Sequence, residues 1–331
     1  MGDVLDVIVI GAGPTGLACG IEAVSAGMTV LILEKGCLVN SIYRYPANLT
    51  FFTTRERLEI GEIPFSSINL KPTRAEAMEY YRRVTDFYHQ PIRYEEQVIG
   101  IAPLDEAFQV EAQSKSESRR TYRSRKVIIA TGYYDRPNFL GIPGEDLSKV
   151  SHYATEGHAF YGRKVAVIGG ANSAAITALD LYRHGAEVTL IYRGPELNKH
   201  IKYWIRPDIE NRIKEKSIHA FLESHVTEIT WDSICIRTGS GEHLKLENDF
   251  VFALTGYHPD VDLLRRAGAE VDPKTYCPIF DPKTLESNVP GLYLAGVLIS
   301  GRRTNEIFIE NGRFHGKLII DDIKQSSDGS Q

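Results

Sequence analysis

The 331-residue sequence predicts an α/β protein with two domains, each built on a parallel sheet, in which the second domain is inserted into the first. Three observations support this prediction. An apolar strand pattern, a glycine loop and a helical pattern follow one another between Asp6 and Gly20, and the same order recurs between Lys164 and Tyr182. Short alternating strands separate the two copies, and a strand followed by a helical pattern closes the chain after residue 290.

The first copy contains the loop Gly11-Ala12-Gly13-Pro14-Thr15-Gly16. Its three glycines permit, in order, a tight turn, the close approach of a diphosphate and the close packing of helix on strand. The amides and dipole of the helix then face the phosphates. The next strand, Thr29–Leu33, ends at Glu34, where a carboxylate can accept a hydrogen bond from a ribose 2′-hydroxyl. This arrangement is typical of a site for FAD.

The second copy reads Gly169-Gly170-Ala171-Asn172-Ser173-Ala174, so alanines replace its middle and last glycines. The backbone therefore approaches a diphosphate less closely, and the loop alone is a weaker indication. The following strand, Glu187–Tyr192, ends at Arg193, where a cation can pair with a 2′-phosphate. The second site therefore suits NADPH, with a solvated strand-end charge as the alternative reading of Arg193.

Segments rich in proline and glycine at 136–144 and 258–259 are the expected linkers. They place an FAD-binding domain at residues 1–138 and 259–325 and an NADPH-binding domain at 139–258. A helix over 74–89 and a β-meander are expected within the first part. One long helix from about Thr304 to Lys324 should end the fold, with a disordered tail at 326–331.

Composition excludes several classes of function. A net charge of −5 and a pI near 6.1 provide no basic face for nucleic acid or anionic lipid. No apolar run is long enough to span a bilayer, the amino terminus does not match a signal peptide, and four cysteines do not form a disulfide framework. We therefore expect a cytoplasmic protein without a nucleic-acid partner or a membrane span.

Several strings of residues resemble the bacillithiol-disulfide reductase family, within the low-molecular-weight thioredoxin reductase-like flavoproteins. They are SIYRYP at 41–46, FF at 51–52, IGEIPF at 60–65, ATGYY at 130–134 and IFIENGRFHG at 307–316, while the string LAG at 294–296 resembles the wider thioredoxin reductase class. The resemblance covers nearly the whole chain. It implies two Rossmann-like domains, tightly held FAD, NADPH as electron donor, a homodimer or homotetramer, and a low-molecular-weight disulfide as the oxidant.

The loops, the strand ends and this resemblance together select the candidate cofactor residues. Those expected at FAD are Gly11, Gly13, Pro14, Thr15, Gly16, Glu34, Lys35, Tyr43, Thr131, Gly132, Gly296, Val297, Ile307 and Phe308. Those expected at NADPH are Gly169, Gly170, Asn172, Ser173, Ala174, Arg193 and Gly256. No metal ligand is expected.

Two departures from the family pattern leave the catalytic residues unassigned. Thioredoxin reductases carry a Cys-x-x-Cys pair before the second glycine loop, where this chain reads YATEGH at 153–158. The bacillithiol-type family often has a cysteine directly after the Gly-Pro of the first loop, and here that residue is Thr15.

Each of the four cysteines and His315 has either a structural or a functional interpretation. Cys19 is expected to be buried and inert, while Cys37 and Cys235 lie away from the expected chemistry. Cys277, in a loop, would be reactive only beside a cation. His315 could donate a proton to a departing thiolate, and ordinary hydrogen bonding is the alternative.

The sequence thus predicts an NADPH-dependent flavoprotein oxidoreductase that passes a hydride to FAD and then reduces a small oxidant, with a bacillithiol-type disulfide as the leading candidate. An NADPH-dependent electron-transfer reductase for ferredoxin, flavodoxin or a quinone remains open, with the basic hairpin Arg119–Lys126 as its docking patch. A nucleotide-binding redox sensor with little turnover is the third possibility.

Overall fold

The computed structural model describes residues 4–328 and divides into two compact units. Unit 1 combines the residues up to Arg44 with Leu49–Arg136 and the residues from Tyr257 onward, and unit 2 combines Tyr45–Asn48 with Pro137–Gly256. Each unit contains one of the two strand–glycine loop–helix copies.

Unit 1 is built on a seven-stranded sheet with the order β3-β2-β1-β6-β5-β4, in which β15 also pairs with β6. The strands β3, β2, β1, β6 and β15 are parallel, whereas β4, β5 and the first half of β6 form the expected antiparallel meander. Their bounds are β1 Leu5–Ile10, β2 Val30–Leu33, β3 Ile92–Arg93, β4 Glu96–Leu104, β5 Ala107–Ser114, β6 Arg119–Ile129 and β15 Leu292–Leu294.

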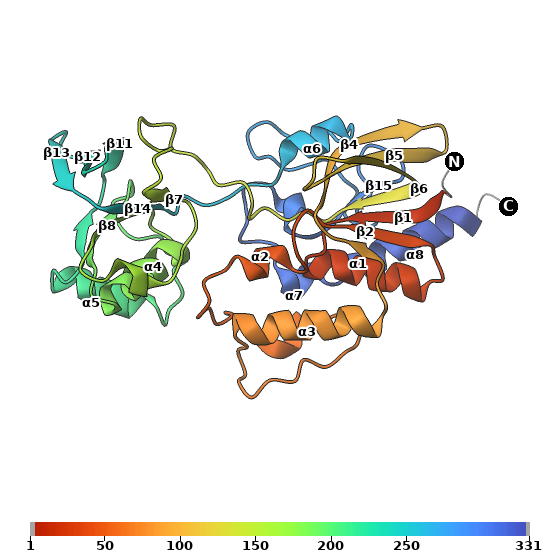
Figure 1. Cartoon of the computed structure of the whole chain (residues 1–331), viewed down its shortest axis with the longest axis horizontal. Coiled ribbons are helices and arrows are strands. Elements are labelled where there is room, and N and C mark those ends of the chain that lie inside the picture. Colours follow the sequence, from red (N-terminus) through yellow and green to blue (C-terminus); the bar gives the residue numbers. More distant parts are fainter. Residues whose placement is uncertain (1–3, 329–331) are drawn as a thin grey trace. The chain divides into compact units, whose positions relative to one another are not determined.

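The first helix, α1 (Pro14–Ser25), packs against β1, β2 and β6 on one side and against α8 on another (Figure 1). Its buried face includes Leu17 and Ile21, and Gly13 in extended conformation precedes Pro14, whose ring suits a first helical position. The other helices of unit 1 are α2 Asn40–Tyr43, α3 Arg74–Phe87, α6 Val261–Arg266, α7 Ile309–Gly312 and α8 His315–Asp328, with short 3₁₀ turns at Arg55–Leu58 (η1) and Gly296–Ser300 (η3).

The prediction of a single long terminal helix from about Thr304 to Lys324 is wrong. The structure contains two helices, because residues 304–308 are not helical and the chain turns between α7 and α8. In addition, α8 extends to Asp328, so the helix continues into the tail expected to be disordered from 326, while residues 329–331 lie outside the described residues.

Unit 2 contains a five-stranded parallel sheet with the order β10-β9-β8-β14-β7 and a three-stranded antiparallel sheet with the order β11-β12-β13. The first sheet is covered by α4 through a core that includes Val167, Ala178, Leu190 and Phe252. The elements are β7 Val150–Ser151, η2 Gly157–Phe160, β8 Lys164–Ile168, α4 Asn172–Arg183, β9 Glu187–Ile191, α5 Arg206–Lys214, β10 His219–Phe221, β11 His225–Ile229, β12 Ser233–Arg237, β13 His243–Glu247 and β14 Phe250–Ala253.

Candidate functional site

The first glycine loop joins β1 to α1, and steric contacts explain two of its three glycines. Gly11 has a φ of +105°, and a Cβ there would lie 2.7 Å from the carbonyl oxygen of Ala130. A Cβ on Gly16 would lie 1.9 Å from the carbonyl oxygen of Gly11. By contrast, nothing lies within 4 Å of a Cβ built on Gly13. The space in front of Gly13, at the start of α1, therefore suits a diphosphate.

Glu34 lies at the end of β2 and is only 5% exposed. Its Oε2 accepts a hydrogen bond of 2.8 Å from the backbone N–H of Ala12, and its Oε1 accepts one of 2.8 Å from the N–H of Gly36. Burial raises the pKa of the carboxyl group, and these two backbone donors oppose that shift. Each oxygen retains a lone pair, so the carboxylate is still able to accept a hydrogen bond from a ribose hydroxyl.

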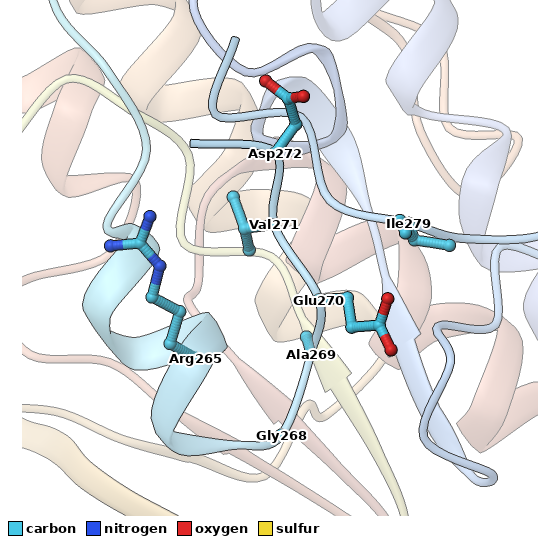
Figure 2. Close-up of a pocket in the computed structure, with 7 residues that line it drawn as sticks. All are labelled: Arg265, Gly268, Ala269, Glu270, Val271, Asp272 and Ile279. Atoms are coloured by element: carbon cyan, nitrogen blue, oxygen red, sulfur yellow. The ribbon is translucent and has the colours of Figure 1, made fainter. Parts of the chain in front are cut away.

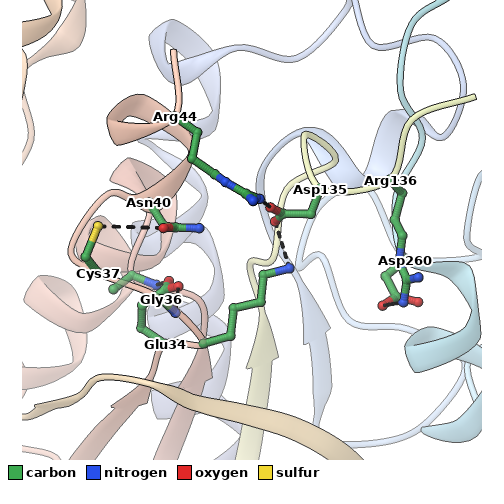
Figure 3. A network of polar contacts seen from close by, with 10 residues as sticks. Glu34, Gly36, Cys37, Asn40, Arg44, Asp135, Arg136 and Asp260 are labelled. Atoms are coloured by element: carbon green, nitrogen blue, oxygen red, sulfur yellow. Dashed lines mark hydrogen bonds and ion pairs between the residues drawn. The ribbon is translucent and has the colours of Figure 1, made fainter. Parts of the chain in front are cut away.

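Lys35 and Arg44 form a charged network with Asp135 (Figure 3). The Nζ of Lys35 lies 2.8 Å from Oδ2 of Asp135, and a terminal nitrogen of Arg44 lies 2.9 Å from Oδ1. The neighbouring Arg136 pairs with Asp260 at 2.7 Å. Lys35, which is expected at the cofactor, thus forms an ion pair with Asp135, a residue that the sequence analysis missed.

Thr15, at the start of α1, packs against two other segments of unit 1. Its Oγ1 lies 3.2 Å from the position of a Cβ on Gly296 and 2.9 Å from that of a Cβ on Gly312. Gly296 also donates a backbone hydrogen bond of 3.0 Å to Nδ1 of His315. The structure therefore brings the first glycine loop, the end of β15 and the α7–α8 region together at Thr15.

His315 is buried at the start of α8, and burial lowers its pKa to about 4. The ring is therefore neutral at neutral pH, and its Nδ1 accepts rather than donates. With Nδ1 accepting from Gly296, the neutral ring carries its proton at Nε2, and the hydrogen bond to Gly296 matches the alternative of ordinary hydrogen bonding.

The remaining expected FAD residues lie at element ends in unit 1. Thr131 and Gly132 follow β6, with a φ of +71° at Gly132. Val297 lies in η3, and Ile307 and the half-exposed Phe308 precede α7. Tyr43 ends α2, half-exposed, with the guanidinium carbon of Arg74 5.4 Å from its ring centroid.

The second glycine loop reproduces the first in unit 2. Gly169 has a φ of +142°, and a Cβ there would lie 2.5 Å from the carbonyl oxygen of Leu254, just as Gly11 faces Ala130. The methyl group of Ala174, where the first loop has Gly16, lies 3.1 Å from that position. Gly170 packs against the ring of Tyr192, and Gly256 has a φ of +90° after β14. The internal repeat is thus a structural repeat as well.

Two expected NADPH residues differ in what their side chains do. Arg193 is exposed two residues after the end of β9 and forms no ion pair with any residue between 4 and 328. Asn172, the first residue of α4, uses its amide within the protein: Oδ1 accepts from the N–H of Lys202 at 2.9 Å, and Nδ2 donates to the carbonyl oxygen of His200 at 3.2 Å. Both polar atoms of the Asn172 side chain thus bond to the segment 200–202. Ser173 and Ala174 lie in the first turn of α4.

All four cysteines are free thiols. Cys19 is buried in α1, and burial raises its pKa to about 12. Burial also raises the pKa of Cys37, whose Sγ lies 3.6 Å from Oδ1 of Asn40. Cys235 lies in β12 of unit 2. Cys277 donates to the carbonyl oxygen of Ser300 at 3.3 Å, and a guanidinium nitrogen of Arg303 lies 3.8 Å from its Sγ.

The basic hairpin Arg119–Lys126 is partly neutralised within the protein. Arg120 pairs with the buried Glu96, and Arg125 pairs with Asp6. The charge available for docking an acidic protein is therefore smaller than the sequence alone indicates.

A shallow hollow of about 440 Å³ opens between α6 and the loop that follows it (Figure 2). Arg265, Glu270 and Asp272 give it charges of both signs, and none of its lining residues belongs to a glycine loop. The described side chains form no group of three or more His, Cys, Asp or Glu that could hold a metal ion. No helix within residues 4–328 has the length and apolarity needed to cross a membrane.

A family model described as pyridine nucleotide-disulphide oxidoreductase matches residues 8–296, which include both glycine loops. The chain belongs to this family. Bacilliredoxin reductase Bdr of Bacillus subtilis is 44% identical to this family member over 317 residues, which cover 96% of each chain. The solved structure of bacillithiol disulfide reductase Bdr (YpdA) from Bacillus cereus has a TM-score of 0.96 at 43% identity and covers 98% of this chain and 100% of that chain.

The fold extends to more distant proteins. Thioredoxin reductase of T. acidophilum has a TM-score of 0.76 at 23% identity over 99% of this chain and all of that one. These similarities confirm the thioredoxin reductase-like fold, the family resemblance, the assignment as an NAD(P)H-dependent flavoprotein oxidoreductase, and FAD and NADPH as its cofactors.

Proposed function

We propose that this pyridine nucleotide-disulphide oxidoreductase uses NADPH to reduce a low-molecular-weight disulfide of the bacillithiol type. In the net reaction, NADPH, one proton and the disulfide yield NADP⁺ and two thiols. The observation that carries the proposal is the similarity to Bdr proteins along nearly the full length of both chains.

In this proposal unit 1 holds FAD and unit 2 holds NADPH. The open space at Gly13 accommodates the FAD diphosphate, and Glu34 accepts a hydrogen bond from the ribose hydroxyl while its two backbone hydrogen bonds keep it in place. FAD held by these residues of unit 1 would supply the redox chemistry that links NADPH to the disulfide. Arg193 provides a cation for the 2′-phosphate of NADPH.

We further propose that no thiol of this chain forms a mixed disulfide with the substrate. Thr15 occupies the position after Gly-Pro, where a thiolate would gain from the dipole of α1. Cys19, one turn later, is buried and its pKa is raised, so it is a poor nucleophile. The chain's contribution to the second half-reaction is then to bind and orient the disulfide.

An acceptor panel tests the proposed function. The FAD-loaded protein is reduced anaerobically with one equivalent of NADPH, and the return of flavin absorbance is followed after addition of bacillithiol disulfide, glutathione disulfide, ferredoxin, flavodoxin or a quinone. We expect fast reoxidation by bacillithiol disulfide with release of two thiols per NADPH. If glutathione disulfide alone reoxidised the flavin, the substrate would be a small disulfide other than bacillithiol disulfide. If no disulfide reoxidised the flavin, the proposed disulfide reductase function would be refuted.

A second candidate is an NADPH-dependent reductase that passes single electrons to ferredoxin, flavodoxin or a quinone. The observation that favours it is Thr15, because such a reductase needs no thiol beside the first glycine loop. Fast reoxidation by one of these acceptors, and by no disulfide, would support it over the main proposal.

The proposal includes a homodimer or homotetramer and a cytoplasmic location. Four free thiols are consistent with a reducing compartment. The mass of the FAD-loaded protein in solution, measured by light scattering, tests the first of these two statements.

A further inference from the structure

We infer that Asp135 is a positioning residue for FAD, because its ion pairs with Lys35 and Arg44 hold the segment 35–44 against the first glycine loop. The inference rests on the proposed placement of FAD in unit 1. All of the residues that carry it belong to that unit.

The two ion pairs of Asp135 join both ends of this segment to one side chain. Lys35 directly follows Glu34 at the end of β2, and Arg44 directly follows α2. The Nζ of Lys35 lies 2.8 Å from one carboxylate oxygen of Asp135, and a terminal nitrogen of Arg44 lies 2.9 Å from the other (Figure 3). Asp135 itself follows β6, so the network links the segment to the neighbouring strand end.

The middle of the segment bonds to the glycine loop itself. The N–H of Val39 donates to the carbonyl oxygen of Ala12 at 3.0 Å, next to Gly13, where the space for a diphosphate lies. Val39 is buried and has a φ of +46°, a left-handed conformation that a β-branched residue rarely adopts. Such a conformation persists only where the surrounding contacts impose it. The ion pairs at the two ends of the segment supply contacts of this kind.

The network lies close enough to Glu34 to act on its charge. Burial raises the pKa of Glu34, the backbone donors at Ala12 and Gly36 oppose that shift, and so does the positive charge of Lys35. The negative charge of Asp135 adds to the increase in pKa. Since Glu34 is the proposed partner of the ribose hydroxyl, the network borders the part of the site that would hold the adenosine ribose.

Charge and position predict opposite effects for the loss of Asp135. The FAD diphosphate is anionic, so removal of a nearby carboxylate would, through charge alone, tighten FAD binding. Removal also breaks both ion pairs, and a loosened segment would have to become ordered when FAD binds, which costs affinity. The inference requires this second effect to prevail.

The first experiment measures the release of FAD from the loaded protein by the rise of flavin fluorescence after dilution. Asp135→Asn should release FAD roughly tenfold faster. The matched control is Asp208→Asn in unit 2, because Asp208 also pairs with two arginines, Arg183 of α4 and Arg212 of α5. The control should release FAD at an unchanged rate.

The second experiment examines the segment in the apoprotein. Trypsin cleaves after Lys35 and Arg44, so mass spectrometry of a limited digest reports how firmly the segment is held. Asp135→Asn should speed cleavage at these two sites severalfold, whereas Asp208→Asn should not. Cleavage that is unchanged, or that is faster at every site alike, would overturn the positioning role.

Denaturation of the apoprotein separates positioning from a general structural role. Lys35 and Arg44 are each about half exposed, and ion pairs of exposed side chains contribute little to stability, so Asp135→Asn should leave the midpoint nearly unchanged. If Asp135→Asn does not fold, Arg44→Gln decides, since it breaks only one of the two pairs. It should speed cleavage after Lys35 in the apoprotein, and unchanged cleavage there would overturn the inference.

The outcomes also separate this inference from the proposed function. Release of FAD from a folded Asp135→Asn variant at the original rate, or more slowly, would overturn the role of Asp135 and leave the proposed function intact. Failure of the unmodified protein to bind FAD at all would instead refute the proposed function.

Discussion

Gly16 lies so close to Gly11 that a Cβ on Gly16 would be 1.9 Å from the carbonyl oxygen of Gly11. A side chain at position 16 would therefore force the first turn of α1 to shift away from the end of β1, so the packing of helix on strand depends on this glycine. Three residues earlier, at Gly13, which directly precedes α1, the chain leaves open space. The two glycines of one loop therefore serve different purposes, and this difference can be measured.

Gly13→Ala should abolish or greatly weaken FAD binding while leaving the apoprotein stable. The φ of Gly13 is −75°, which alanine adopts without strain, and the added methyl group meets no protein atom, so unfolding of the apoprotein should change by no more than about 0.5 kcal/mol. Gly16→Ala is the contrasting variant and should cost about 1–3 kcal/mol of stability through overpacking. Flavin content and apoprotein denaturation curves check both, and an alanine at 13 that retains full FAD would contradict the diphosphate assignment.

Arg193→Ala should shift nucleotide preference from NADPH towards NADH. Loss of a charge-assisted contact worth roughly 1.5–3 kcal/mol should weaken NADPH by about one to two decades and leave NADH nearly unchanged. Rates of flavin reduction at varied NADPH and NADH measure this. Arg237→Ala, on β12 of the same unit, is a control with the same loss of charge. Equal losses for both nucleotides would show that Arg193 has a structural role.

A variant with Cys19, Cys37, Cys235 and Cys277 all replaced should fold, keep FAD and retain most of its disulfide turnover. The reason is that none of these four cysteines lies directly after Gly-Pro, where the start of α1 would activate the thiol. Flavin reduction by NADPH and acceptor turnover are measured separately. A single replacement that stops acceptor turnover while flavin reduction stays fast would reveal a nucleophile, and Cys277 beside Arg303 would be the first to examine.

Thr15→Cys should raise disulfide reductase activity, because the start of α1 lowers the pKa of a thiol and favours attack on a disulfide. Thr15→Ser is the matched control, since it keeps a hydroxyl of similar size. If Thr15→Cys leaves turnover unchanged in a protein that already reduces bacillithiol disulfide quickly, then a cysteine at this position is dispensable for the reaction.

The stability of the protein should fall on acidification from pH 6.5 towards pH 4 in a way that depends on His315. Burial lowers the pKa of His315 from 6.5 to about 4, so the unfolded chain binds an additional proton within this window. Neutral His315 contributes about 3 kcal/mol at most to the free energy of unfolding. This contribution is complete above pH 6.5 and is lost as the pH falls to 4. His315→Gln removes the titration and can still accept from Gly296, so its stability should vary less with pH. If the free energy of unfolding changed with pH to the same extent in the unmodified protein and in His315→Gln, the low pKa of His315 would be refuted.

The sequence by itself determined the two glycine loops, the strand-end residues Glu34 and Arg193, and the family. These features are local, because glycine conformation, apolar periodicity and the residue after a strand follow from neighbouring positions in the chain. The repeat of Gly11 facing Ala130 and Gly169 facing Leu254 then follows from placing the same local unit twice.

Tertiary structure alone decided what several side chains do. Lys35 pairs with Asp135, one hundred residues further along the chain, and the amide of Asn172 is taken up by a loop near residue 200. Segments distant in sequence bury His315 and thereby lower the pKa of its ring, and the terminal helix divides where Gly312 packs against Thr15. Such contacts join residues far apart in sequence, and the partner of a charged or polar group is set by packing, which local periodicity does not encode.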